Sequence, residues 1–220
     1  MIVKICGVTR LDDAGQVAEV GADMIGLNFY EPSPRYIEPT AAREIVDAMR
    51  DHFGDECPIM VGVFVNASVS TMESVMAAAD LDFVQLSGDE SPAVLVELRG
   101  KGYKAVRPPN LQLAIMDATD YADTFPADER VPSLLLDAYH PKLYGGTGET
   151  ASVEVALEVK GRAPRLLLAG GLNPDNVASR VAAIRPWGVD VASGVEPEGQ
   201  PGIKDIEKVA AFVAAAKSVE

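Results

Sequence analysis

The chain has 220 residues, of which 48% are hydrophobic and 24% charged. These values exclude a disordered protein, and the chain is long enough to form a buried core. The net charge of −14 makes nucleic acid and anionic membranes poor partners, and an anionic substrate would need local backbone amides or an arginine to overcome it.

Short apolar segments alternate with longer amphipathic segments along the whole chain. The apolar segments are rich in Leu, Ile and Val, as strands buried on both faces are. In chain order they are 2–6, 24–29, 59–65, 83–86, 104–107, 133–137, 165–169 and 189–192. Predicted helices follow them, beginning at 11 and 39, spanning 70–79, 92–99 and 111–117, beginning at 152, and spanning 174–184 and 205–216.

Two of the predicted helices carry start signals. Ser70 stands three residues before Glu73, which is the spacing of a capping box. Asn173 followed by Pro174 predicts an N-cap residue and a proline in the first helical position.

The eight strand–helix repeats predict one (β/α)8 barrel domain, a TIM barrel, over residues 1–220. A doubly wound open sheet produces the same alternation and is the alternative. No linker marks a second domain, and the irregular stretch 125–132 is short enough to be one loop.

The two cysteines, Cys6 and Cys57, are too few for a disulfide scaffold and favour a reducing cytoplasm. They form no CxxC pair, and with only His52 and His140 beside them no zinc pattern can be built. We expect no signal peptide and no membrane span, because the apolar segments are too short for either. The predicted location is therefore cytoplasmic.

In a barrel the active site lies at the carboxyl ends of the strands. The candidate site residues are therefore the polar or reactive ones that follow the apolar segments. They are Cys6, Asn28, Arg35, Asn66, Gln85, Arg107, Asp137, Gly170, Gly171, Ser193 and Gly194.

Glycine clusters at 145–148, 170–171 and 192–195 follow the last three predicted strands. Backbone amides exposed by glycines bind phosphate, and the loops after strands 7 and 8 of barrels are the usual phosphate site. The simpler interpretation is that these glycines only turn the chain. Their position favours phosphate binding.

Cys6 and Asp137 are candidates for a base and an acid. A thiol acts as a base only when it is ionised, and Lys4 points to the same side of its strand as Cys6. Asp137 follows three leucines, where burial would raise its pKa enough for a general acid. The alternatives are a small buried Cys6 and an Asp137 that only orders its own loop.

Arg35 lies in a loop stiffened by two prolines, where its planar guanidinium suits bidentate capture of a carboxylate. A solvated surface arginine is the alternative.

The chain resembles the phosphoribosylanthranilate isomerases of tryptophan biosynthesis along its whole length. Eight strings of residues, in the same order, carry the resemblance. They are Lys4-Ile5-Cys6-Gly7, Ser33-Pro34-Arg35-Tyr36, Gly62-Val63-Phe64-Val65-Asn66, Gln85-Leu86, Leu136-Asp137-Ala138 with Gly145-Gly146-Thr147-Gly148, Ala169-Gly170-Gly171-Leu172-Asn173-Pro174, Val189-Asp190-Val191-Ala192-Ser193-Gly194-Val195-Glu196 and Gly202-Ile203-Lys204-Asp205.

The resemblance implies an Amadori rearrangement of N-(5′-phosphoribosyl)anthranilate without metal or organic cofactor. It implies that Cys6 is the general base, Asp137 the general acid and Arg35 the group that holds the anthranilate carboxylate. The phosphate is expected on amides around Gly171, Asn173, Ser193 and Gly194. The expected partner is a phosphorylated small molecule, and the chain is expected to be a monomer or a homodimer.

Two positions depart from the family pattern. Ser87 stands where the family usually has His, and Glu149 stands where it usually has Lys. These changes alter the fourth and sixth loops and leave the proposed acid, base and arginine in place. Two other functions remain open: another sugar-phosphate isomerase or epimerase, and a barrel that binds a phosphorylated ligand without turnover.

Overall fold

A computed structural model describes residues 1–138 and 152–219. Eight strands form one closed barrel, in which each strand pairs in parallel with its neighbours in sequence and β1 closes on β8. The strands are β1 Ile2–Cys6, β2 Met24–Asn28, β3 Ile59–Phe64, β4 Phe83–Leu86, β5 Gly102–Val106, β6 Leu134–Leu136, β7 Leu166–Leu168 and β8 Gly188–Val191. The predicted (β/α)8 barrel is confirmed, and the open sheet is wrong.

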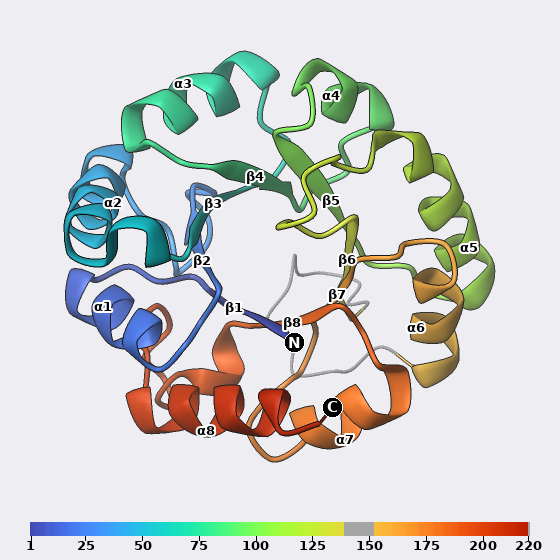
Figure 1. The fold of residues 1–220 in the computed structure, drawn as a ribbon. Coiled ribbons are helices and arrows are strands. Elements are labelled where there is room, and N and C mark those ends of the chain that lie inside the picture. The colour runs from blue at the N-terminus through green and yellow to red at the C-terminus, as the bar shows by residue number, and fades with distance from the viewer. Residues whose placement is uncertain (139–151, 220) are drawn as a thin grey trace.

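A ring of helices surrounds the barrel (Figure 1). The helices are α1 Leu11–Glu19, α2 Pro39–Phe53, α3 Val69–Ala79, α4 Pro92–Glu97, α5 Leu111–Asp120, α6 Val153–Lys160, α7 Val177–Ile184 and α8 Ile206–Lys217. Short 3-10 turns occur at η1 Gly54–Glu56, η2 Ala122–Thr124 and η3 Ser193–Val195. Among the residues placed in the structure, no helix is long and apolar enough to cross a membrane.

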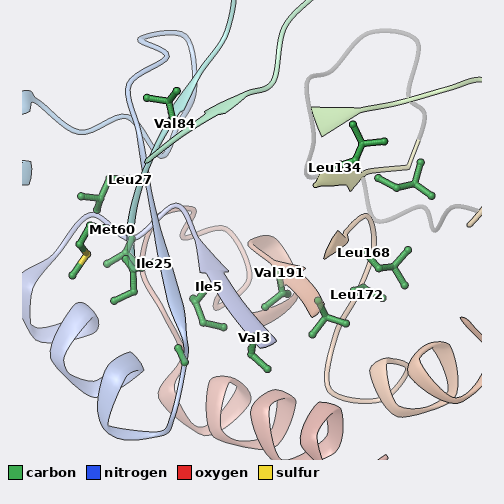
Figure 2. Close-up of a cluster of buried hydrophobic side chains, with 14 of the residues drawn as sticks. Val3, Ile5, Ile25, Leu27, Met60, Val84, Leu134, Leu168, Leu172 and Val191 are labelled. Atoms are coloured by element: carbon green, nitrogen blue, oxygen red, sulfur yellow. The ribbon is translucent and has the colours of Figure 1, made fainter. Parts of the chain in front are cut away.

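The strands alternate their side chains between two buried layers, as the period of two requires. One layer packs between strands and helices, and Figure 2 shows Val3 and Ile5 directed from β1 toward the helices. The other fills the barrel interior with side chains such as Met24, Tyr103 and Leu167. Both faces of the strands are therefore buried, which explains why the sequence segments are almost continuously apolar.

Both predicted helix starts are wrong by a few residues. The N-cap of α3 is Ser68, whose hydroxyl accepts a hydrogen bond from the Thr71 amide, so Ser70 lies inside the helix. Asn173 precedes a turn before α7, and its Oδ1 accepts from the amides of Asp175 and Asn176. In each case another polar residue two or three positions away, Ser68 for α3 and Asn176 for α7, is the N-cap, because Ser and Asn side chains at neighbouring positions can all bond backbone amides.

Candidate active site

A pocket of about 340 Å³ opens at the carboxyl ends of the strands. Most of the site residues expected from the sequence line this pocket. They are Cys6, Asn28, Arg35, Gln85, Arg107, Asp137, Gly170, Gly171, Ser193 and Gly194. Barrel closure thus brings together residues from both ends of the chain, as expected for an enzyme built on this fold.

Two expected residues are not among those that line the pocket. Asn66 is used to join loops, since its amide donates to Glu90 and its Oδ1 accepts from the Asp89 amide. The Asn173 amide donates to Asn176 Oδ1 at 2.9 Å and is already engaged. The glycine cluster 145–148, His140 and Glu149 lie outside the described residues.

Cys6 ends β1, is buried and lines the pocket. Lys4, two residues earlier on the same side of the strand, is completely buried, and its ammonium lies close enough to the thiol to favour the thiolate. Its Nζ also forms an ion pair with Asp190 Oδ1 at 2.9 Å. Lys4 and Asp190 are direct partners in the register of β1 and β8, so barrel closure makes this pair.

The pKa values in this group follow from burial and charge. Burial raises the pKa of the Cys6 thiol, and the Lys4 ammonium offsets only part of that rise. Burial by itself disfavours the Lys4 ammonium, but Asp190, with smaller contributions from Cys6 and Tyr103, outweighs burial, so the pKa of Lys4 is raised and this residue stays charged. Lys4 is therefore a permanent cation beside a thiol that is mostly protonated without ligand.

Asp137 follows β6 and faces the same pocket. Its Oδ1 accepts a hydrogen bond from the Ala138 amide at 2.8 Å. Burial raises the pKa of Asp137 to about 6 despite this bond, as the three leucines before it predicted. Gly170 lies against it, because a Cβ there would fall 2.9 Å from Asp137 Oδ1 and 2.4 Å from the Ala138 nitrogen.

The loops after β7 and β8 meet at Gly194. A Cβ at this position would lie only 2.0 Å from the Leu172 carbonyl oxygen, so a larger residue would separate the loops. Gly171, with a φ of 59°, and Ser193 complete this wall of the pocket. Backbone approaches the pocket closely here, which is what a site for a phosphate group requires.

Arg35 reaches the pocket from the loop after β2. Its Nε and Nη2 donate to the two carboxylate oxygens of Glu196 at 2.8 and 2.6 Å. The solvated alternative for Arg35 is therefore wrong, because 17% of its side chain is exposed and it is ion-paired. Asn28 supports the loop, since its Nδ2 donates to Ser33 Oγ at 3.2 Å.

Ser87, which stands where the family usually has His, lines the pocket. Its Oγ accepts a hydrogen bond from Gln85 Nε2 at 3.0 Å. Gln85 Oε1 in turn accepts from the Tyr103 hydroxyl. The serine hydroxyl thus extends a polar chain from the barrel interior to the pocket wall.

Sequence reasoning assigned no role to Asp190, Glu196 or Lys204. A signal was present, because Asp190 is a charged residue inside an apolar strand segment and such residues are rarely buried without a partner. Within the described ranges, no group of three His, Cys, Asp or Glu side chains is placed to hold a metal ion.

The fold and pocket define a (β/α)8-barrel protein with an acid and a thiol in one site. Residues 3–215 match the family model described as N-(5'phosphoribosyl)anthranilate (PRA) isomerase. An N-(5'-phosphoribosyl)anthranilate isomerase from Citrifermentans bemidjiense is 44% identical over 99% of this chain and 97% of its own.

Solved structures agree with the family match. The phosphoribosyl anthranilate isomerase of Thermotoga maritima superposes with a TM-score of 0.85 at 35% identity, covering 99% of this chain and 100% of that one. A second isomerase structure, 34% identical with a TM-score of 0.82, covers the same shares and holds reduced 1-(o-carboxyphenylamino)-1-deoxyribulose 5-phosphate.

The chain belongs to the N-(5'-phosphoribosyl)anthranilate isomerase family. It is an isomerase of tryptophan biosynthesis that acts on a phosphorylated small molecule, as the resemblance implied. This family membership favours the isomerase over the other sugar-phosphate enzymes and over a barrel that only binds.

Proposed function

We propose that Cys6 and Asp137 are the base and the acid of an Amadori rearrangement. The substrate would be N-(5′-phosphoribosyl)anthranilate and the product 1-(2-carboxyphenylamino)-1-deoxyribulose 5-phosphate. The observation that carries the proposal is an Asp137 carboxyl with a pKa of about 6 in the same pocket as the Cys6 thiol. The two groups come from β6 and β1, so they can act on different parts of a bound sugar.

The reaction moves protons and leaves the atom count unchanged. Asp137 donates its proton to the furanose ring oxygen, and the C1–O bond breaks to give a protonated Schiff base. Cys6, as the thiolate, removes the proton from sugar C2, which gives an enolamine. Tautomerisation of the enolamine to the ketone yields the product, and no oxidant, reductant or metal enters the balance.

The reactive form of the enzyme is a minor one. It needs a protonated Asp137 and an ionised Cys6, although burial keeps the pKa of Cys6 above that of Asp137. Lys4 limits this cost, because its buried ammonium favours the thiolate.

The substrate has an anionic group at each end, and the pocket offers a site for each. Arg35 would hold the anthranilate carboxylate. Backbone amides around Gly171, Asn173, Ser193 and Gly194 would hold the phosphate. The Asn173 amide can take part only if it leaves Asn176, so the other three residues are the stronger candidates.

The test is the decay of substrate fluorescence with purified protein. Substrate is generated in place from anthranilate and phosphoribosyl pyrophosphate by the preceding enzyme. We expect decay to accelerate with wild type and the gain to be lost in Cys6→Ser and in Asp137→Asn, while each variant still binds the reduced product analogue. A variant that keeps full turnover would remove its residue from the proposal.

Location and assembly are separate proposals. We expect a cytoplasmic enzyme, because its thiols Cys6 and Cys57 are both free. We expect a monomer or a homodimer, which sedimentation at several protein concentrations distinguishes.

A further inference from the structure

Glu196 forms the centre of a buried ion cluster at the edge of the pocket. Its carboxylate accepts two bonds from Arg35, one from Lys204 Nζ at 2.8 Å and one from the Gly202 amide at 3.0 Å. The Glu196 and Lys204 side chains are 4% and 1% exposed. A carboxylate with four donors at this depth is held in one position.

The aliphatic part of the Arg35 side chain is also held in place. Gly7 follows Cys6, and a Cβ on Gly7 would fall 2.4 Å from Arg35 Cδ, so the arginine stem lies directly against this glycine. The φ of Gly7 is +72°, a conformation that favours glycine. Arg35 is thus held between the residue next to the thiol and the carboxylate of Glu196.

Glu196 takes only one edge of the guanidinium. It engages Nε and Nη2, whereas the end of the group, formed by Nη1 and the second hydrogen of Nη2, is the edge that a second carboxylate can use. Within the described part of the chain, no hydrogen bond occupies Nη1. The pairing therefore orients Arg35 without consuming it.

The cluster has two cations and one anion, so it is locally positive in a chain of net charge −14. It is also joined to the wall expected to hold phosphate. Glu196 directly follows η3, and Lys204 Nζ donates to the Ala192 carbonyl at 3.3 Å. One unit thus touches the loop after β2 and the loop after β8.

We propose that Glu196 is a positioning residue that sets the Arg35 guanidinium for the substrate carboxylate. This inference rests on the proposed function, because it assumes that Arg35 takes the carboxylate. The inference adds Glu196 as a residue that does not contact the substrate but determines the affinity for the substrate carboxylate. Specificity for an aglycone that carries a carboxylate would then depend on a side chain 161 positions away from Arg35.

The experiment compares Glu196→Gln with wild type. We expect KM to rise by about 10- to 100-fold, the range for a lost charge-assisted bond, with kcat changed less than about threefold. Binding of reduced 1-(o-carboxyphenylamino)-1-deoxyribulose 5-phosphate should weaken by a similar factor. Inhibition by ribose 5-phosphate, which has the phosphate and no carboxylate, should stay within about twofold of wild type.

A double-mutant cycle separates positioning from a general structural effect. On an Arg35→Met background, Glu196→Gln should produce no further rise in KM, because the residue it positions is gone. Glu196→Asp keeps the negative charge and shortens the side chain by one methylene, which breaks the two-point contact with Arg35, so the same selective rise is expected. It serves as the second variant if Glu196→Gln does not fold.

Glu90→Gln is the matched control. Glu90 is another buried carboxylate paired with a lysine, at 3.0 Å from Lys104 Nζ, and it does not line the pocket. It should lose stability with KM within about threefold of wild type. Equal loss of affinity for ribose 5-phosphate and the product analogue in Glu196→Gln, or an unchanged KM, would overturn the proposal.

The two proposals fail in different ways. If wild type shows no turnover, the proposed reaction is wrong, but analogue and ribose 5-phosphate binding still test Glu196. If wild type turns over and Glu196→Gln binds the analogue as wild type does, only the positioning role is wrong.

Discussion

Gly26 faces the Cys6 thiol across the β1–β2 pair so closely that a Cβ on Gly26 would lie 2.8 Å from Sγ. The same Cβ would lie 3.0 Å from Lys4 Nζ. Because Gly26 has no side chain, the Cys6 thiol and the Lys4 ammonium can occupy the space beside it. Gly26, which has no functional side chain, thus determines the positions of these two groups.

Gly26→Ala should disturb this pair. We expect overpacking to cost about 1–3 kcal/mol of unfolding free energy and displacement of the thiol to lower kcat at least about tenfold. Urea unfolding and steady-state kinetics measure both. Gly15→Ala is the control, because a Cβ there meets nothing within 4 Å and should stabilise α1 by about 0.5–1 kcal/mol. Wild-type kcat in Gly26→Ala would contradict the role assigned to this space.

The pH dependence of kcat/KM should be bell-shaped with a wide plateau. Activity should fall below about pH 6, because Asp137 is then fully protonated and each further drop in pH only removes thiolate. It should fall again only above the pKa of Cys6, which burial raises above the ordinary value, because Cys6 is then ionised and further loss of protons only removes the Asp137 acid. A profile with no acid limb between pH 5 and 7 would contradict this assignment.

Lys4→Met should act on the thiol and on stability together. Without the ammonium the pKa of Cys6 rises further, so alkylation by iodoacetamide at pH 8 should slow, measured on a Cys57→Ala background. The variant also leaves Asp190 buried without its cation, which should cost about 3–5 kcal/mol.

The control for Lys4→Met is the double variant Lys4→Met with Asp190→Asn. It should recover part of the stability, because both buried charges are gone. If Cys6 is alkylated at the same rate with and without Lys4→Met on the Cys57→Ala background, Lys4 does not support the thiolate.

Asp137→Asn should stabilise the protein at pH 8. The folded pKa of about 6 lies above the ordinary 3.8, so ionisation of Asp137 opposes folding by on the order of 2–3 kcal/mol above pH 6. As pH falls from 6 to 4 the folded protein binds this proton, so most of the gain should disappear. Urea unfolding at pH 8 and pH 4 measures the difference.

Asp128 provides a control of opposite sign. Hydrogen bonds from Arg130 lower the pKa of Asp128 to about 2, so its charge supports folding at pH 8. Asp128→Asn should therefore destabilise, by less than about 1 kcal/mol because the pair is largely exposed. If Asp137→Asn destabilises the protein at pH 8, burial does not disfavour the ionised form of Asp137 in the folded protein.

The sequence by itself determined the barrel and the position of the reacting groups. Segments such as 134–136 and 166–168 are apolar throughout because barrel strands are covered on both faces, and eight of them in alternation with helices permit few other folds. Residues that follow such strands must meet at one end of the barrel. Cys6, Asp137 and Gly194 could therefore be assigned to one pocket from their positions in the sequence.

Only the tertiary structure decided the partners of these groups. Lys4 meets Asp190 across 186 positions because β1 closes on β8, and Arg35 meets Glu196 because two loops distant in sequence share one edge of the pocket. A linear pattern does not contain the register of barrel closure. The state of Cys6 depends on the same geometry, because burial and the nearby Lys4 shift its pKa in opposite directions and only their depth and distance determine which prevails.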